Sequence, residues 1–116
     1  MSIRAVYVLS AFSESTRKTI RLIAEYLGGR GQKCFTYRGL RRYWDKKRAY
    51  YTLEWHTAER AIRKLAEDGW LKRVEIREKK RGGGRKVLFC LTEPLRILLE
   101  EMRWLSYRDA GGEEPE

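Results

Sequence analysis

Cationic residues are the side chains of this sequence best suited to bind a ligand, and they gather in three stretches. One set lies on one face of an expected helix over residues 53–68: His56, Glu59, Arg60, Arg63 and Lys64. A second set lies in the glycine-containing segment 78–86: Lys79, Lys80, Arg81, Arg85 and Lys86. A third set precedes both: Arg38, Arg41, Arg42, Lys46, Lys47 and Arg48. Arginine and lysine bind phosphates, and a helix-borne arginine can donate two hydrogen bonds to a guanine edge. The three stretches predict contact with a nucleic acid.

Two of the stretches also have a plainer interpretation. The helix face can be a solvated surface held by pairs four residues apart, such as Glu59 and Arg63. The glycine-rich segment can be a solvated turn without a partner. We favour the binding interpretation, because the helix face and the basic turn can contact the groove and the backbone of one nucleic acid together.

The overall charge agrees with a polyanionic partner. The chain has 116 residues and a formal net charge of +10. All 26 Lys and Arg lie at or before Arg108, whereas four of the 16 acids lie after it, so the preceding body carries +14. Such a body attracts nucleic acid or an anionic membrane surface by long-range electrostatics. The alternative is a charge excess kept only for solubility.

The residue types needed for catalysis are sparse, and we expect no enzyme. His56 is the one histidine, and Cys34 and Cys90 lie too far from it in sequence for a zinc pattern. The segment 81–86 lacks the spacing and the Ser or Thr of a Walker loop. The run 28–31 has the GxxG form, which helix capping explains better. We expect no cofactor, no metal and no small-molecule substrate.

Periodicity and capping residues predict the elements that position these cations. Ser13 caps a helix that Gly28 and Gly29 stop, and Thr36 caps a second, short helix followed by a connection over 45–51. Thr52 caps the helix 53–68, and strands follow over 71–77 and 87–91. The expected organisation is an N-terminal strand or arm (1–12), a domain over 13–108 that ends in a helix over 93–107, and a disordered acidic tail (109–116).

The run from Thr57 to Leu71, followed by the basic glycine turn, resembles the recognition helix and wing of winged helix-turn-helix proteins. MarR-like, PadR-like and many archaeal regulators share this pattern. The resemblance implies an α+β fold with a three-helix core, a small antiparallel β-wing and a C-terminal helix. It also implies a transcriptional regulator that places helix 53–68 in the major groove of double-stranded DNA and the wing 78–86 on the backbone. The connection between the second and third helices is longer than in the simplest members. A protein–protein adaptor and an RNA-binding protein are the alternatives.

The same resemblance suggests a strand pairing that involves both cysteines. In winged-helix sheets the short first strand pairs with the last, which puts Cys34 and Cys90 on one face. The two cysteines can form a disulfide if the source is a hyperthermophile, or they can be two unlinked thiols.

Two helices are apolar on a second face, which predicts a homodimer through four residues: Leu22, Tyr26, Ile97 and Trp104. The alternative is that the N-terminal strand covers them within one chain. No run approaches the ~20 apolar residues of a membrane span, so the cytoplasm is the expected location.

Overall fold

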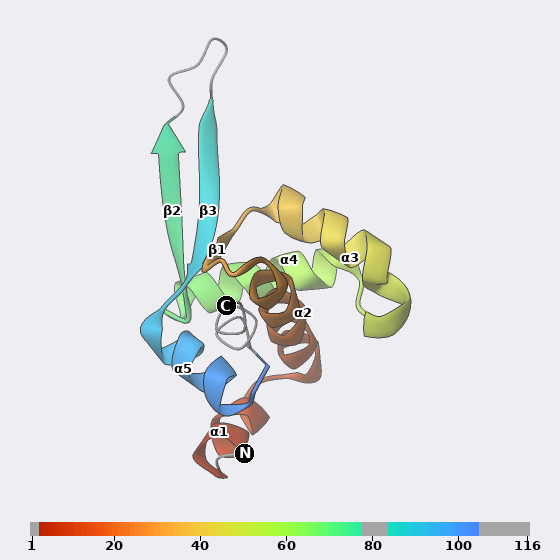
Figure 1. Ribbon diagram of the computed structural model, residues 1–116, viewed down its shortest axis with the longest axis vertical. Coiled ribbons are helices and arrows are strands. Elements are labelled where there is room, and N and C mark those ends of the chain that lie inside the picture. The colour runs from red at the N-terminus through yellow and green to blue at the C-terminus, as the bar shows by residue number, and fades with distance from the viewer. Residues whose placement is uncertain (1–2, 78–83, 105–116) are drawn as a thin grey trace, which may run out of the picture.

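The computed structural model describes residues 3–77 and 84–104, and these form an α+β fold (Figure 1). Within these ranges there are five helices and three strands. In chain order they are α1 (Ile3–Ser10), α2 (Glu14–Arg30), β1 (Cys34–Phe35), α3 (Tyr37–Tyr51), α4 (Trp55–Glu67), β2 (Leu71–Arg77), β3 (Arg85–Leu91) and α5 (Glu93–Glu101). The predicted α+β class with a small antiparallel sheet is confirmed, and the arrangement is compatible with a winged helix.

Helix α2 runs through the middle of the core. The Ser13 side chain accepts a hydrogen bond from the Thr16 amide, as its predicted capping role requires. The predicted stop at Gly28 and Gly29 is wrong, because the helix continues to Arg30 and Gly31 adopts the left-handed conformation (φ 63°) that ends it. The apolar face of α2 is buried against α3 and α4.

Helix α3 is longer than predicted. Thr36 caps its start, accepting a hydrogen bond from the Gly39 amide, but the expected connection over 45–51 is helical. Trp44 and Tyr51 explain the extension, because both keep helical spacing and both are buried in the core. Thr52 therefore ends α3 and does not begin α4.

The turn between α3 and α4 is short, so the expected long connection is also wrong. It spans residues 52–54, and Glu54 precedes the first residue of α4. The indole Nε1 of Trp44 donates a hydrogen bond of 2.7 Å to the Leu53 carbonyl, which holds the turn against α3. Ala58, Ile62 and Leu65 of α4 are buried, as their spacing predicts.

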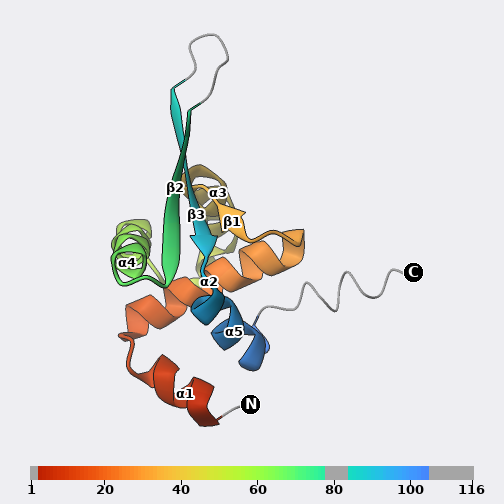
Figure 2. The same cartoon turned by 90° about the vertical axis from the view of Figure 1, so that its left-hand side faces the viewer.

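The strands form one antiparallel sheet in the order β1-β3-β2. Phe35 pairs with Phe89 and Cys34 with Cys90, which is the predicted pairing of the first and last strands. In the structure Cys34 and Cys90 form a disulfide with a Cα–Cα distance of 4.0 Å. Beyond β1 the β2–β3 hairpin projects from the helices (Figure 2).

The N-terminal segment is a helix, so the predicted strand or arm over 1–12 is wrong. Ala5 and Leu9 are both buried, whereas Tyr7 between them is 80% exposed. A strand would put all three on one face, and a helix separates Tyr7 from the other two. This burial outweighs the strand preference of the β-branched and aromatic residues between them. Helix α5 ends at Glu101, earlier than the predicted 107, and residues 105–116, including the acidic tail, lie outside the described part of the chain. Among the described helices none is long and apolar enough to cross a membrane.

Candidate nucleic-acid interface

The outward face of α4 carries the candidate recognition residues. His56, Arg60, Arg63 and Lys64 are exposed, and Glu59 is half-buried. Lys64 lies 3.8 Å from Asp68, whereas Arg60 and Arg63 form no ion pair or side-chain hydrogen bond with any described residue. The alternative pair of Glu59 and Arg63 does not form. Two guanidinium groups are thus presented to the solvent from one helix face.

A groove separates α4 from the hairpin. Its lining includes Tyr37, Arg63, Glu67, Arg73 and Val87. The ring centroid of Tyr37 lies 4.8 Å from that of Phe89, which closes the groove floor. Burial raises the pKa of the Tyr37 hydroxyl, and the nearby Arg63 guanidinium opposes that rise. The Tyr37 hydroxyl therefore remains a neutral donor and acceptor beside α4.

The hairpin adds two cations that the sequence analysis missed, Arg73 and Arg77. Arg73 pairs with Phe89, and Arg77 with Arg85, so these side chains share one face of the hairpin. Since Phe89 and Arg73 both line the groove beside α4, this is the face that borders α4. The alternation of residues in β2 was visible in the sequence, but the strand register was needed to choose the face.

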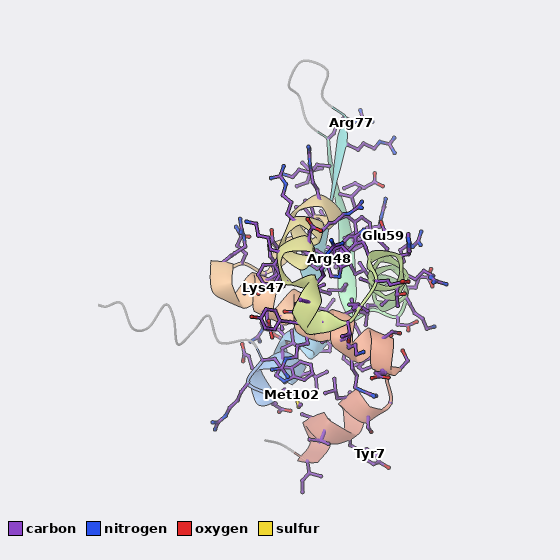
Figure 3. The ribbon with its side chains drawn as sticks, turned by 90° about the vertical axis from the view of Figure 1, so that its right-hand side faces the viewer. Tyr7, Lys47, Arg48, Glu59, Arg77 and Met102 are labelled. Atoms are coloured by element: carbon purple, nitrogen blue, oxygen red, sulfur yellow. A yellow bond between two sulfur atoms is a disulfide. The ribbon has the colours of Figure 1, made fainter. Side chains whose placement is uncertain are left out.

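Glu75 offsets part of this charge. Its carboxylate lies 2.7 Å from Arg73 and 3.7 Å from Arg85, and the hydrogen bond from Arg73 lowers the pKa of Glu75. Arg77 makes no ion pair with a described residue and lies on the projecting part of the hairpin (Figure 3). Of the predicted wing cations, Arg85 and Lys86 lie on opposite faces of β3, and Lys79, Lys80 and Arg81 lie outside the described residues.

A second groove lies between α3 and the start of α4. Its lining includes Arg41, Arg48, Thr52, His56 and Glu59. Arg48 lies 3.8 Å from Asp45 and stacks on Trp44, with its guanidinium carbon 5.8 Å from the ring centroid. The cations of α3 therefore meet α4 through Arg41 and Arg48.

The structure does not bring all six predicted α3 cations to that groove. Successive residues of a helix differ by about 100° in direction. Figure 3 accordingly shows Lys47 and Arg48 on different sides of α3, with Glu59 of α4 on the side of Arg48. Lys47 lines a separate pocket against α2. The other three, Arg38, Arg42 and Lys46, are exposed and line neither of these grooves.

Two of the four predicted dimer residues are wrong. Leu22 is fully buried, and Tyr26 is 8% exposed because α3 covers it, with the Tyr43 ring centroid 5.4 Å away. Trp104 is half-buried beneath Arg21, whose guanidinium carbon lies 5.0 Å from the ring centroid. Ile97 is the one of the four that is exposed. The helix α3, not the N-terminal segment, covers Tyr26.

Comparisons with known proteins give little beyond this geometry. No protein-family model matches the chain, and no curated protein matches it significantly. A solved structure described as a "possible transcriptional regulator" from Methanosarcina mazei Go1 aligns over 95% of this chain and 82% of its own length. Its sequence identity is 15% and its TM-score is 0.49. That likeness is too distant to identify a family.

Proposed function

We propose that this chain is a winged-helix protein that binds double-stranded DNA and regulates transcription, with α4 in the major groove. The observation that supports the proposal most is the outward face of α4, where Arg60 and Arg63 are exposed and have no partner among the described residues. A helix about 10–12 Å wide fits the ~12 Å major groove, and free guanidinium groups there can pair with guanine edges.

The elements on either side of α4 supply backbone contacts. Arg77 and Arg85 on the hairpin flank one side, and Arg41 and Arg48 of α3 flank the other. Such cations fix the orientation of a protein on the duplex and make affinity depend on salt, without reading the sequence. This proposal assigns the protein no catalytic activity.

We also propose that the protein is a homodimer. Because Leu22 and Tyr26 are buried within one chain, the proposed interface lies on α1 and α5. Ile3 is 87% exposed and Tyr7 80% exposed on the outer side of α1, and Ile97 is exposed on α5 beside a groove between these helices. This end lies opposite the hairpin (Figure 1). These two helices together carry no net positive charge, because α1 has one cation and α5 has three acids and one base. Two copies can therefore meet here without the repulsion that their basic surfaces would produce.

Fluorescence anisotropy with a labelled random-sequence duplex tests DNA binding, with single-stranded RNA of equal length as competitor. The proposal predicts a Kd of about 1–100 µM at physiological salt, which is usual for non-specific binding, and weak competition by RNA. If single-stranded RNA displaces the labelled duplex at a lower concentration than unlabelled duplex does, the protein is an RNA-binding protein. The absence of binding even at low salt would favour a protein–protein adaptor.

A further inference from the structure

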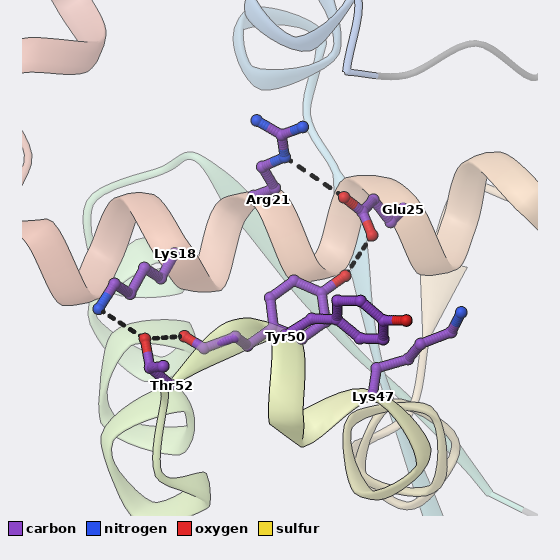
Figure 4. Close-up of a pocket in the computed structure, with 7 residues that line it drawn as sticks. Lys18, Arg21, Glu25, Lys47, Tyr50 and Thr52 are labelled. Carbon is purple, nitrogen blue, oxygen red and sulfur yellow. Dashed lines mark hydrogen bonds and ion pairs between the residues drawn. The ribbon is translucent and has the colours of Figure 1, made fainter.

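A second basic pocket lies outside the α4 interface, between α2 and α3 (Figure 4). It has a volume of about 490 Å³. Seven residues line it: Lys18, Arg21, Glu25, Lys47, Tyr50, Tyr51 and Thr52. Three of these side chains are cations and one is a carboxylate, so the pocket carries an excess of two positive charges.

The carboxylate is already satisfied by its neighbours. Arg21 Nε lies 3.3 Å from Glu25 Oε2, and the Tyr51 hydroxyl donates to Glu25 Oε1 (Figure 4). Burial and the hydrogen bond to Glu25 raise the pKa of the Tyr51 hydroxyl, which therefore stays protonated and keeps donating. Glu25 and Arg21 thus form a neutral wall, and the excess charge belongs to the two lysines.

Neither lysine has a strong anionic partner among the described residues. Lys18 Nζ lies 3.6 Å from Glu14, whose side chain is 75% exposed and lies outside the pocket. Lys47 Nζ lies over the rings of Tyr43 and Tyr50, at 5.9 and 5.7 Å from their centroids. Figure 4 shows the two ammonium groups at opposite ends of the pocket with Tyr50 between them, so the anion that they attract together carries charge at two positions.

Thr52 provides an independent indication of function. It has φ 44° and ψ 45°, a left-handed conformation that is unusual for a β-branched residue. Glycine would fit this position more easily, yet the threonine hydroxyl accepts a hydrogen bond of 3.1 Å from Lys18 Nζ. Strained non-glycine residues concentrate at ligand sites, where a particular side chain is needed. Thr52 holds a hydroxyl and an ammonium group together at the pocket.

From these contacts we propose that the pocket between α2 and α3 binds a ligand with two linked phosphate groups. Lys18 contacts one phosphate beside Thr52, and Lys47 contacts the other at the opposite end of the pocket (Figure 4). The ring of Tyr50, 81% exposed, lies beside the pocket and offers a surface for a base or sugar attached to the phosphate. The two phosphates belong either to the DNA backbone or to a free phosphorylated molecule.

The position of Thr52 connects the pocket with the proposed DNA surface. Thr52 also lines the groove between α3 and α4, so the two sites share one wall. A phosphate in the pocket therefore lies next to the start of α4. When the phosphate comes from DNA, the inference rests on the proposed function; when it is free, the inference stands independently.

The test compares Lys18→Gln/Lys47→Gln with a control that loses the same charge, Lys33→Gln/Lys72→Gln, at two exposed lysines that line neither the pocket nor the grooves beside α4. Two quantities are measured on the full chain: the salt dependence of duplex DNA binding, and the NMR shifts of backbone amides over residues 50–53 on addition of inorganic pyrophosphate. A backbone phosphate predicts a salt slope lower by about 1–2 in the pocket variant but not in the control. If the phosphate is free, both variants should have the same salt slope. Pyrophosphate should then shift the amides of the wild type but not those of the pocket variant.

Two results separate this inference from the proposed function. If the wild type binds no DNA, the proposed function is wrong and the pyrophosphate titration alone decides the pocket. If pyrophosphate shifts no amide in the wild type and the two variants have equal salt slopes, the pocket is no phosphate site, whatever α4 does. Thermal unfolding of both variants identifies any loss that comes from misfolding.

Discussion

The disulfide between Cys34 and Cys90 is expected to contribute heavily to the stability of this small domain. It joins β1 to β3 across a sequence separation of 56 residues. Closing a loop of that length removes chain entropy from the unfolded state, about 14 cal/mol/K, or about 4 kcal/mol at 25 °C. A domain of ordinary stability has about 5–15 kcal/mol in total, so the bond accounts for a large share.

The perturbation is the Cys34→Ser/Cys90→Ser double variant, and the assay is guanidinium denaturation followed by tryptophan fluorescence. With a slope of about 4 kcal/mol per molar denaturant, the loss predicts a midpoint lower by about 1 M. Wild type in strong reductant serves as the control, since it should move to the midpoint of the variant. Two titratable thiols in the denatured, unreduced protein, or equal midpoints for wild type and variant, would refute the reasoning.

Four further substitutions test the packing and the proposed dimer. Gly29→Ala should raise the free energy of unfolding by about 0.5–1 kcal/mol, because the surroundings of Gly29 are open. Gly39→Ala should lower the free energy of unfolding, because the new Cβ would lie 2.6 Å from the Tyr26 hydroxyl. Urea denaturation compares the two variants. Trp44→Phe should cost about 1–3 kcal/mol in the same assay, since a buried carbonyl in the α3–α4 turn loses its donor, and an unchanged midpoint would contradict this. Tyr7→Arg should convert a dimer to a chain of 13.8 kDa by light scattering; a wild type already of that mass would contradict the dimer.

Local signals predicted the helices where capping and burial agree. Ser13 and Thr36 begin α2 and α3 as expected, because the hydroxyl before each helix accepts a bond from its first turn. Thr52 misled the prediction, because a threonine between two helical segments fits the start of one as well as the end of the other. Only the burial of Tyr51 and its contact with Glu25, 26 residues away, decide that α3 continues to it.

The candidate site could be predicted only in part, because contacts between residues that are distant in the sequence are not visible in local patterns. Helical periodicity alone put Arg60 and Arg63 on the outer face of α4, where the structure has them. Strand register was needed to bring Arg73 and Arg77 to the same side, and the packing of α3 on α2 was needed to turn Lys47 away from it. The composition gives the number of cations, but tertiary contacts determine which of them share a surface.

The central claim is that α4 contacts DNA, and binding to random-sequence duplex DNA at two salt concentrations tests it most directly. The wild type is compared with Arg60→Ala/Arg63→Ala and with Lys33→Ala/Lys72→Ala, which loses the same charge at two exposed lysines outside the grooves beside α4. We predict binding that weakens steeply with salt, a loss of about tenfold or more in the α4 variant, and a much smaller loss in the control. Equal losses in the two variants would show that only net charge matters and would contradict the placement of α4 in the groove.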